Sequence, residues 1–229
     1  MTLGIMQPYF MPYIGYWQLM AAVDEYVVYD DVNYIKGGWV SRNRILMSGK
    51  PYMFTIKLNG ASPNKLFNEI EIRDNFVKFR KMLQSCYAKA PYFNETMQLM
   101  EQVYNCESRD LGHFMLNQFQ IVLDYLFCKT KLILSSDLLK DNTLKGADKV
   151  KHICNLLHAD TYYNAIGGKE LYDKLDFAEQ GVDLKFVQTL PIQYKQFNNV
   201  FQPNLSLIDV LMFNSREDVN QLLTQYSLE

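Results

Sequence analysis

The sequence is poor in the side chains that most often carry metal or nucleophilic chemistry. It has four cysteines and three histidines among 229 residues. The cysteines form no Cys-x-x-Cys pair and fall in helical patterns, which is typical of buried thiols in a reducing compartment. His152 and His158 are six residues apart, a spacing that does not place two ligands on one helix face. We therefore predict no metal site. The Walker A, Gly-x-Ser-x-Gly and Gly-x-Gly-x-x-Gly patterns are also lacking.

The sequence also lacks a strong charge imbalance and a long apolar run. A formal net charge of -2 gives no electrostatic preference for nucleic acid or for an anionic membrane. No apolar run approaches the ~20 residues of a membrane span. The N-terminus has neither the basic start nor the apolar core of a signal peptide. These absences predict a cytoplasmic protein, and the length and 48% hydrophobic content fit a single domain over residues 1–229.

The stretch Leu3–Ile45 has the clearest structural pattern. Its first apolar run, Leu3–Met6, must end before Pro8, because proline has no N–H to donate to a sheet. Residues 16–23 then have helical spacing, and 25–29 form a second apolar run. The order strand, turn, helix, strand predicts an α/β sheet with a ligand crevice at the carboxyl ends of its strands.

Charged and amide residues gather directly after the second predicted strand. Asp30 and Asp31 end that strand, and Lys36 and two glycines precede Trp39. Such a group is also compatible with a surface network of ion pairs. Its place at a strand end and the Gly pair beside a tryptophan favour a ligand site. We predict that one pocket, with Lys169 at its rim, is lined by Gln7, Tyr9, Tyr13, Asp30, Asp31, Lys36, Arg42 and Arg44. Since Arg42 and Arg44 alternate as on a strand, only one of them need face it.

Three consecutive helical patterns without an intervening strand follow in the middle of the chain, at 75–88, 92–105 and 109–127. They predict a helical lobe, residues 75–128, inserted into the α/β unit. Before this lobe, strands are expected at 52–58 and 67–72. After it, strand and helix patterns alternate again, with strands expected at 131–135, 161–165 and 184–187, the last of them ended by Leu190-Pro191.

Two further polar features lie in this second half. Gly167 and Gly168 follow the strand at 161–165, where their backbone N–H groups could meet a phosphate or carboxylate, and Lys169 adds charge. Asp209 lies inside an apolar helical stretch. Its carboxylate either anchors a buried hydrogen-bond network or reaches the site.

Four segments of the chain carry a resemblance to a known family: the N-terminal run MQPYFMPYIGYWQLMAAVDEYVVYDDVNYIKGGWVSRNRI, residues 87–93, residues 167–169 with Tyr172, and residues 205–209. They resemble the WbqC-like family. The resemblance spans essentially the whole chain. It implies a role in the biosynthesis of bacterial surface polysaccharides such as O-antigen, where a glycine transferase acting on an amino sugar has been proposed for some members.

A second resemblance lies in Tyr13-Ile14-Gly15-Tyr16, which follows the first predicted strand and opens the first predicted helix. In the HxGH nucleotidyltransferase-like group, which includes pantothenate synthetase, His-x-Gly-His lies in a similar place, so the glycine is kept here and both histidines are replaced. The resemblance implies a three-layer, Rossmann-like (HUP-type) parallel sheet and amide formation from an ATP-activated carboxylate. Tyrosine is neutral at pH 7 and removes charge stabilisation, so the use of ATP stays open. Positive charge could instead come from Lys36, Arg42, Arg44 and Lys169.

Together these features predict an aminoacyl (glycine) or acyl transferase that acts on a nucleotide-linked amino sugar. Asp30 or Asp31 would be the base for the attacking amine, with Lys36 holding phosphate beside it. The expected substrate-binding residues are Gln7, Tyr9, Tyr13, Gly15, Tyr16, Trp39, Arg42, Asn43, Arg44, Gly167, Gly168 and Lys169. If Asp31 is the base, Asp31→Asn should abolish turnover and spare stability. The alternative is a non-catalytic module that binds a nucleotide sugar or a partner enzyme, which the missing histidines favour.

Overall fold

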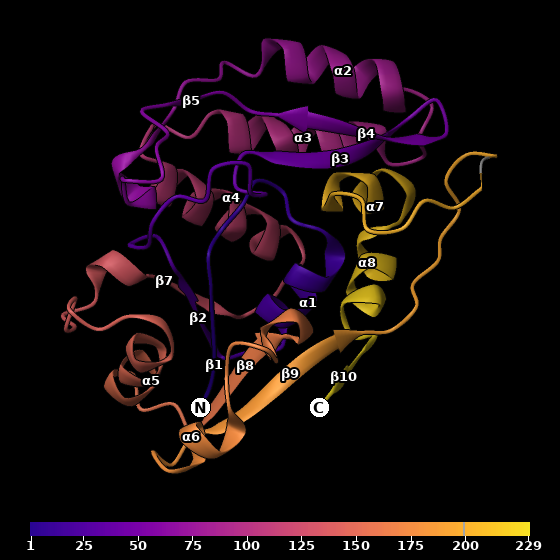
Figure 1. Ribbon diagram of the computed structural model, residues 1–229. Coiled ribbons are helices and arrows are strands. Elements are labelled where there is room, and N and C mark those ends of the chain that lie inside the picture. The colour runs from indigo at the N-terminus through magenta and orange to yellow at the C-terminus, as the bar shows by residue number, and fades with distance from the viewer. Residues whose placement is uncertain (199) are drawn as a thin grey trace.

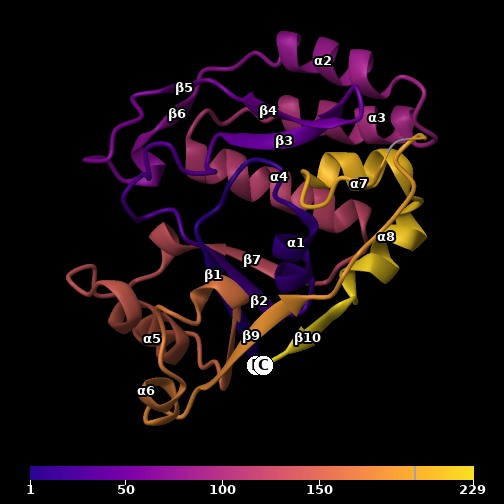
Figure 2. The same ribbon diagram turned by 45° about the vertical axis from the view of Figure 1, so that its right-hand side comes forward.

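One mixed sheet of six strands forms the centre of the computed structural model, which describes residues 1–198 and 200–229 (Figures 1 and 2). Its strand order is β10-β9-β8-β1-β2-β7. The strands are β1 (Thr2–Met6), β2 (Glu25–Val28), β7 (Lys131–Leu134), β8 (Thr161–Ala165), β9 (Asp183–Thr189) and β10 (Tyr226–Leu228). All neighbours are parallel except β10, which runs antiparallel to β9. The predicted α/β class is therefore confirmed.

The position of β1 decides where the chain changes direction across the sheet. β1 pairs with β2 on one side and with β8 on the other. The chain adds β2 and β7 on the first side and then returns to add β8 and β9 on the second. In an open α/β sheet, the crevice for a ligand lies at the carboxyl ends of the two strands where this reversal occurs.

Helices cover both faces of the sheet, because the strands bury side chains on both sides. Along β2, Tyr26 and Val28 belong to one hydrophobic cluster and Val27 to the other, as the alternation of a strand requires. The first cluster includes residues of α1 (Ile14–Ala21), α4 (Leu111–Tyr125), α7 (Leu207–Phe213) and α8 (Arg216–Leu223). The second includes residues of α5 (Gly146–Leu156) and α6 (Lys174–Ala178).

The long connection from β2 to β7 forms the upper part of Figure 1. It contains the elements β3 (Arg42–Met47), β4 (Lys50–Thr55), β5 (Leu58–Asn59), η1 (Phe67–Glu69), β6 (Glu71–Ile72), α2 (Val77–Tyr87), α3 (Phe93–Tyr104) and α4. Helix α4 packs on β2 and β7, and α3 packs on α4 and α7. The aromatic rings of Phe54, Phe79 and Phe114 meet around Phe10, so this region shares one hydrophobic cluster with the sheet. The separate lobe at residues 75–128 stays a prediction.

Several element boundaries differ from the sequence expectations for local reasons. The predicted strand at 67–72 is a short η1 turn followed by β6. The strand expected at 52–58 is β4, and the turn before it has Ser48 at φ 50° and Gly49 at φ 75°, as a two-residue hairpin turn requires. The elements α6 and β10 were not expected, because five and three residues are too short to show a period. None of the helices within residues 1–198 and 200–229 is long and apolar enough to cross a bilayer.

Candidate functional site

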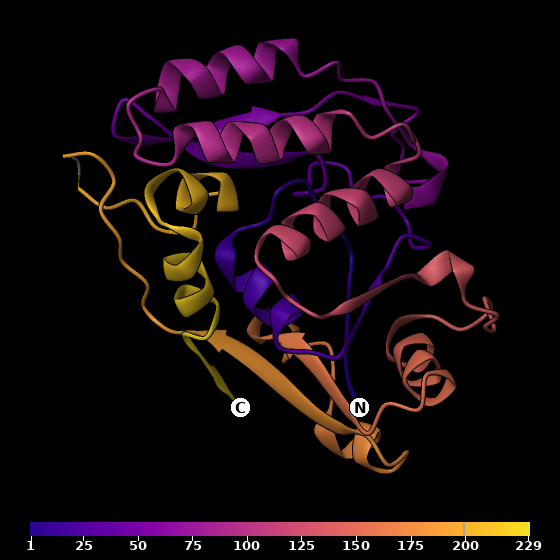
Figure 3. The same cartoon turned by 180° about the vertical axis from the view of Figure 1, so that it is seen from behind.

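A cavity of about 1210 Å³ lies at the carboxyl ends of β1 and β9. We call it the larger cavity. Its floor and walls come from β1, α1, β3 and the β9–α7 segment, which we define as residues 190–198 and 200–206. That segment leaves the end of β9, runs beside α8 and α7, and then reverses direction to reach the first residue of α7 (Figures 1 and 3). The cavity thus lies between the sheet edge and a long connection.

The lining of the larger cavity is aromatic and amide-rich, with one positive charge. Among the described residues that line it, Arg44 is the only charged one. Its guanidinium carbon is 5.4 Å from the centre of the Trp39 ring, which also lines the cavity and is 46% exposed. Tyr9 accepts a hydrogen bond of 3.1 Å from the backbone N–H of Tyr13. Burial raises the pKa of both tyrosines, so their hydroxyls stay protonated near neutral pH and can donate to a ligand.

A second cavity of about 540 Å³ adjoins the first, and we call it the smaller cavity. The two share the residues Met6, Tyr9, Tyr16 and Trp39 as lining. Nine of the residues named from the sequence line one cavity or the other: Gln7, Tyr9, Tyr13, Tyr16, Trp39, Asn43, Arg44, Gly167 and Gly168. Asn43 also donates to the backbone oxygen of Met11 at 2.5 Å, which fixes β3 to the turn after β1.

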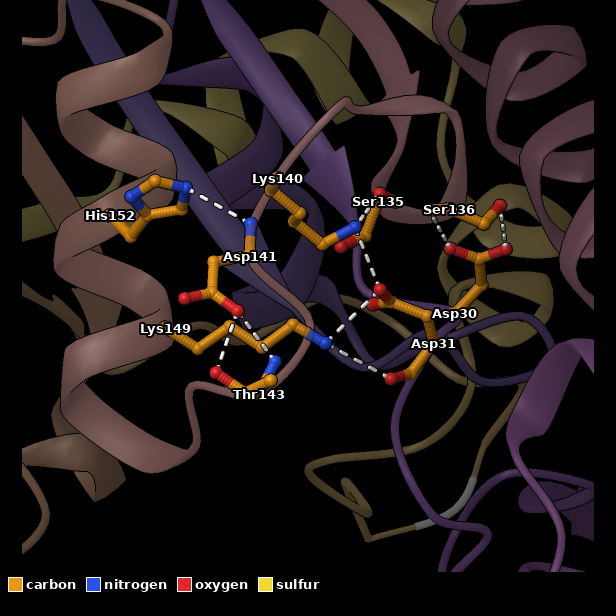
Figure 4. Close-up of polar contacts among 9 residues, drawn as sticks. All are labelled: Asp30, Asp31, Ser135, Ser136, Lys140, Asp141, Thr143, Lys149 and His152. Atoms are coloured by element: carbon orange, nitrogen blue, oxygen red, sulfur yellow. Dashed lines mark hydrogen bonds and ion pairs between the residues drawn. The ribbon is translucent and has the colours of Figure 1, made fainter.

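Asp30 and Asp31 lie outside the lining of both cavities and point into a separate network (Figure 4). Asp30 is fully buried and accepts hydrogen bonds from Ser136 N at 2.9 Å and Ser136 Oγ at 2.7 Å. Burial raises the pKa of Asp30, and the bonds from Ser136 partly oppose this shift. Asp31 Oδ2 is 2.7 Å from Lys140 Nζ and 3.0 Å from Lys149 Nζ. Both carboxylates therefore connect the end of β2 to segments around β7 and α5.

The remaining named residues are also placed apart from the cavities. Lys36 is exposed and lines neither cavity, although its neighbour Ile35 lines the smaller one. Arg42 precedes Arg44 by two positions on β3 but is not in the lining; its guanidinium lies 5.9 Å from the Trp39 ring. Lys169 forms an ion pair with Glu229. The expectation that all eight polar residues line one pocket is thus corrected: burial and ion pairing hold the carboxylates elsewhere.

Gly15 acts by making room rather than by lining a cavity. A Cβ at this position would lie 2.5 Å from Thr189 Oγ1 and 2.5 Å from Cε2 of Tyr13. Both of those residues line the larger cavity. The glycine therefore allows α1 to approach β9 and allows the Tyr13 ring to lie against its own helix.

Gly15→Ala is expected to lower the free energy of unfolding by about 1–3 kcal/mol, because the added methyl group overpacks a tight contact. Urea denaturation measures this loss. Gly167→Ala is the matched control, since a Cβ at Gly167 meets nothing within 4 Å. Equal stability of the two variants would contradict the role given to Gly15.

No pattern in the sequence predicted that the β9–α7 segment would form a wall of the site. Leu190-Pro191 marked only the end of a strand, and the residues that follow have no period. Tyr194 lines the larger cavity and donates to Asp209 Oδ2 at 2.7 Å. Asp209 is fully buried and also accepts from Tyr87 at 2.6 Å and Gln196 at 2.6 Å. Of the two roles considered for Asp209, the anchor of a buried network is confirmed.

Comparisons with known proteins match the chain over most of its length. An uncharacterized protein of Mycobacterium tuberculosis is 27% identical over an alignment of 218 residues, and the match covers 92% of each of the two chains. No solved structure matches the chain significantly. Within the described residues, no group of three His, Cys, Asp or Glu side chains could hold a metal ion. The family model of the WbqC-like proteins matches residues 7–221, from the turn after β1 to α8, and the chain belongs to the WbqC-like protein family.

Proposed function

We propose that the two adjoining cavities bind a nucleotide-linked sugar. The observation that supports this most is one arginine among tyrosine hydroxyls and amides, in a concave site at the reversal of strand order. A guanidinium can form two parallel hydrogen bonds to two oxygens of one phosphate, which is bidentate binding. Tyrosine rings and amide side chains are suited to the faces and hydroxyls of a sugar.

The strand order is consistent with a Rossmann-like (HUP-type) fold, as we propose for the sheet. Written by order along the chain, the strands run 3-2-1-4-5-6, with the sixth antiparallel. This is the order of doubly wound sheets that bind nucleotides at the reversal point. Lys36 follows Ile35, which lines the smaller cavity, but its own exposed side chain is not part of the lining, so we give it no role in holding phosphate.

The reaction we propose is transfer of an aminoacyl or acyl group, such as glycine, to the amino group of that sugar in the synthesis of a bacterial surface polysaccharide. The sugar nitrogen attacks the acyl carbonyl carbon. The acyl donor is an activated carboxylate, such as the mixed anhydride that glycine forms with AMP at the expense of ATP. A C–N bond forms, the bond from the carbonyl carbon to the phosphate oxygen of AMP breaks, and the nitrogen loses a proton to the released AMP or to water. With Arg44 on the phosphates, the Tyr9 and Tyr13 hydroxyls are the donors proposed to hold the carbonyl oxygen. Asp30 and Asp31 then support the sheet edge rather than act as the base.

A second candidate is a binding module without chemistry. The placement of Asp30 and Asp31 outside both cavities favours it, because no carboxylate or histidine is among the described residues that line them. Such a module would hold the nucleotide sugar for a partner enzyme.

Thermal-shift titration and mass spectrometry separate the two candidates. The protein is incubated with UDP-glucosamine, GDP-mannose or dTDP-glucose, with glycine and ATP added or left out. A shift in melting temperature with a new glycyl-sugar mass for the amino sugar is the expected result. Binding without a new mass supports the module, and no shift with any nucleotide-linked sugar contradicts the proposed function.

A further inference from the structure

The smaller cavity differs in chemistry from the larger one. Among the described residues that line it, none carries a charge, and the walls include the rings of Tyr29, Trp39 and Tyr172. An unpaired charge buried in such surroundings is costly, so a phosphate, carboxylate or ammonium group is disfavoured there. A neutral, flat, aromatic group is the best match, since it can stack on the rings.

One polar side chain in this lining is available for the edge of such a group. The amide nitrogen of Gln7 makes a single long contact of 3.4 Å, to the backbone oxygen of Asn33. Gln7 follows directly after β1 and lines the smaller cavity. A nucleobase presents donors and acceptors around its edge, and a glutamine amide can meet both kinds.

Several apolar side chains around the smaller cavity are exposed to solvent. Ile35 comes from the loop after β2 and is 57% exposed, while Leu171 follows η3 (Ile166–Gly168) and is 71% exposed. Both line the smaller cavity together with the half-exposed Trp39. Exposed apolar side chains that gather around a hollow mark a ligand groove.

Trp39, which lines both cavities, connects the smaller cavity to Arg44, a charged residue in the lining of the larger one. The guanidinium carbon of Arg44 is 5.4 Å from the centre of the Trp39 ring. If the base of a nucleotide stacks on Trp39 in the smaller cavity, its phosphates would therefore lie close to the Arg44 guanidinium.

We propose that the smaller cavity binds the base of the nucleotide, with the phosphates at Arg44 and the sugar in the larger cavity. This inference rests on the proposed function and deepens it by assigning each part of the ligand to one cavity. A substitution at Gly167 can test this assignment. Gly167 lines the smaller cavity, a Cβ added there meets nothing within 4 Å, and its φ is not left-handed, so a larger side chain can be placed there.

The test compares Gly167→Leu with Arg44→Gln by calorimetric titration of the full chain. The ligands are UDP-glucosamine, UDP and glucosamine 1-phosphate, with the GDP-mannose and dTDP-glucose sets run in parallel. Gly167→Leu should weaken the nucleotide-linked sugar and the nucleoside diphosphate by about tenfold or more and leave the sugar 1-phosphate nearly unchanged. Arg44→Gln should weaken all three, since each contains phosphate.

A milder pair of variants covers the case in which Gly167→Leu does not fold. Leu171→Ala removes part of the cavity wall, and Leu175→Ala is its control, being 74% exposed and outside the lining of both cavities. Only Leu171→Ala should weaken binding of the nucleotide. If nucleotide-linked sugars bind but the Gly167 and Leu171 variants bind them as the wild type does, the base assignment is overturned alone. If no nucleotide or linked sugar binds the wild type, the assignment and the proposed function are overturned together.

Discussion

Asp31→Asn is expected to lower the free energy of unfolding at pH 7 by about 3 kcal/mol, because it removes the charge that pairs with two buried lysines. The side chain of Asp31 is 10% exposed, and those of Lys140 and Lys149 are 1% and 8% exposed. Lys140 also donates to the backbone oxygen of Ser135, at the end of β7. Water cannot reach either ammonium group well enough to replace the lost carboxylate (Figure 4).

The ion pairs of Asp31 with Lys140 and Lys149 also make the stability depend on pH. Burial acts to raise the pKa of Asp31, but the hydrogen bonds from Lys140 and Lys149 help to bring it below its ordinary value of 3.8. A group whose pKa is depressed in the folded state contributes stability above its unfolded pKa and loses it as the pH falls through the folded pKa. The difference between the wild type and Asp31→Asn should therefore be complete at pH 7 and shrink below about pH 4.

Urea denaturation at pH 7 and pH 3 measures both effects. Asp183→Asn is the control, because Asp183 lies 3.1 Å from Lys185 in an ion pair that is exposed on both sides. The control should change stability little. An Asp31→Asn protein as stable as the control at pH 7 would contradict this account and would agree with the earlier expectation that the substitution spares stability.

Asp209→Ala is expected to cost about 3 kcal/mol or more of unfolding free energy, because three hydrogen-bond donors lose one shared acceptor. Tyr87 comes from α2, Tyr194 and Gln196 come from the β9–α7 segment, and all three meet at this carboxylate. Tyr87 also accepts a bond of 2.7 Å from the backbone N–H of Leu46 in β3. The network therefore fixes a wall of the larger cavity to the hairpin opposite.

The expected loss has a graded comparison in Tyr194→Phe. This variant removes one hydroxyl and leaves Asp209 with two donors, so it should cost about 1 kcal/mol. Both variants should also weaken ligand binding, since Tyr194 lines the larger cavity. Urea denaturation measures the loss of stability, and calorimetric titration with UDP-glucosamine measures the loss of binding. If Asp209→Ala is as stable as the wild type, the hydrogen bonds to Asp209 do not hold the β9–α7 segment in place.

The strands and long helices were predictable because their signals are local. The apolar run Leu3–Met6 and the proline after it specify β1, and the helical spacing of residues 109–127 specifies α4. The alternation of Arg42 and Arg44 on a strand indicated that only one of them need face the site, and of the two it is Arg44 that lines the larger cavity.

The partners of the carboxylates were not predictable, because they come from distant parts of the chain. Asp31 is separated from Lys149 by 118 residues, and Asp30 from Ser136 by 106 residues. Sequence proximity suggested instead that Asp30 and Asp31 would face the same ligand as Lys36 and the arginines. The strand order that brings β7 beside β2 decides the matter, and no local pattern encodes it.

Fluorescence of Trp39 tests the central claim that a nucleotide-linked sugar occupies the two cavities. The chain has two tryptophans, of which Trp17 is fully buried and Trp39 lines both cavities. Titration with UDP-glucosamine, GDP-mannose and dTDP-glucose should give a saturable change in emission for at least one of them, and Trp39→Phe should abolish that change. Emission that stays constant for all three ligands, or a change of the same size in Trp39→Phe, would contradict the claim.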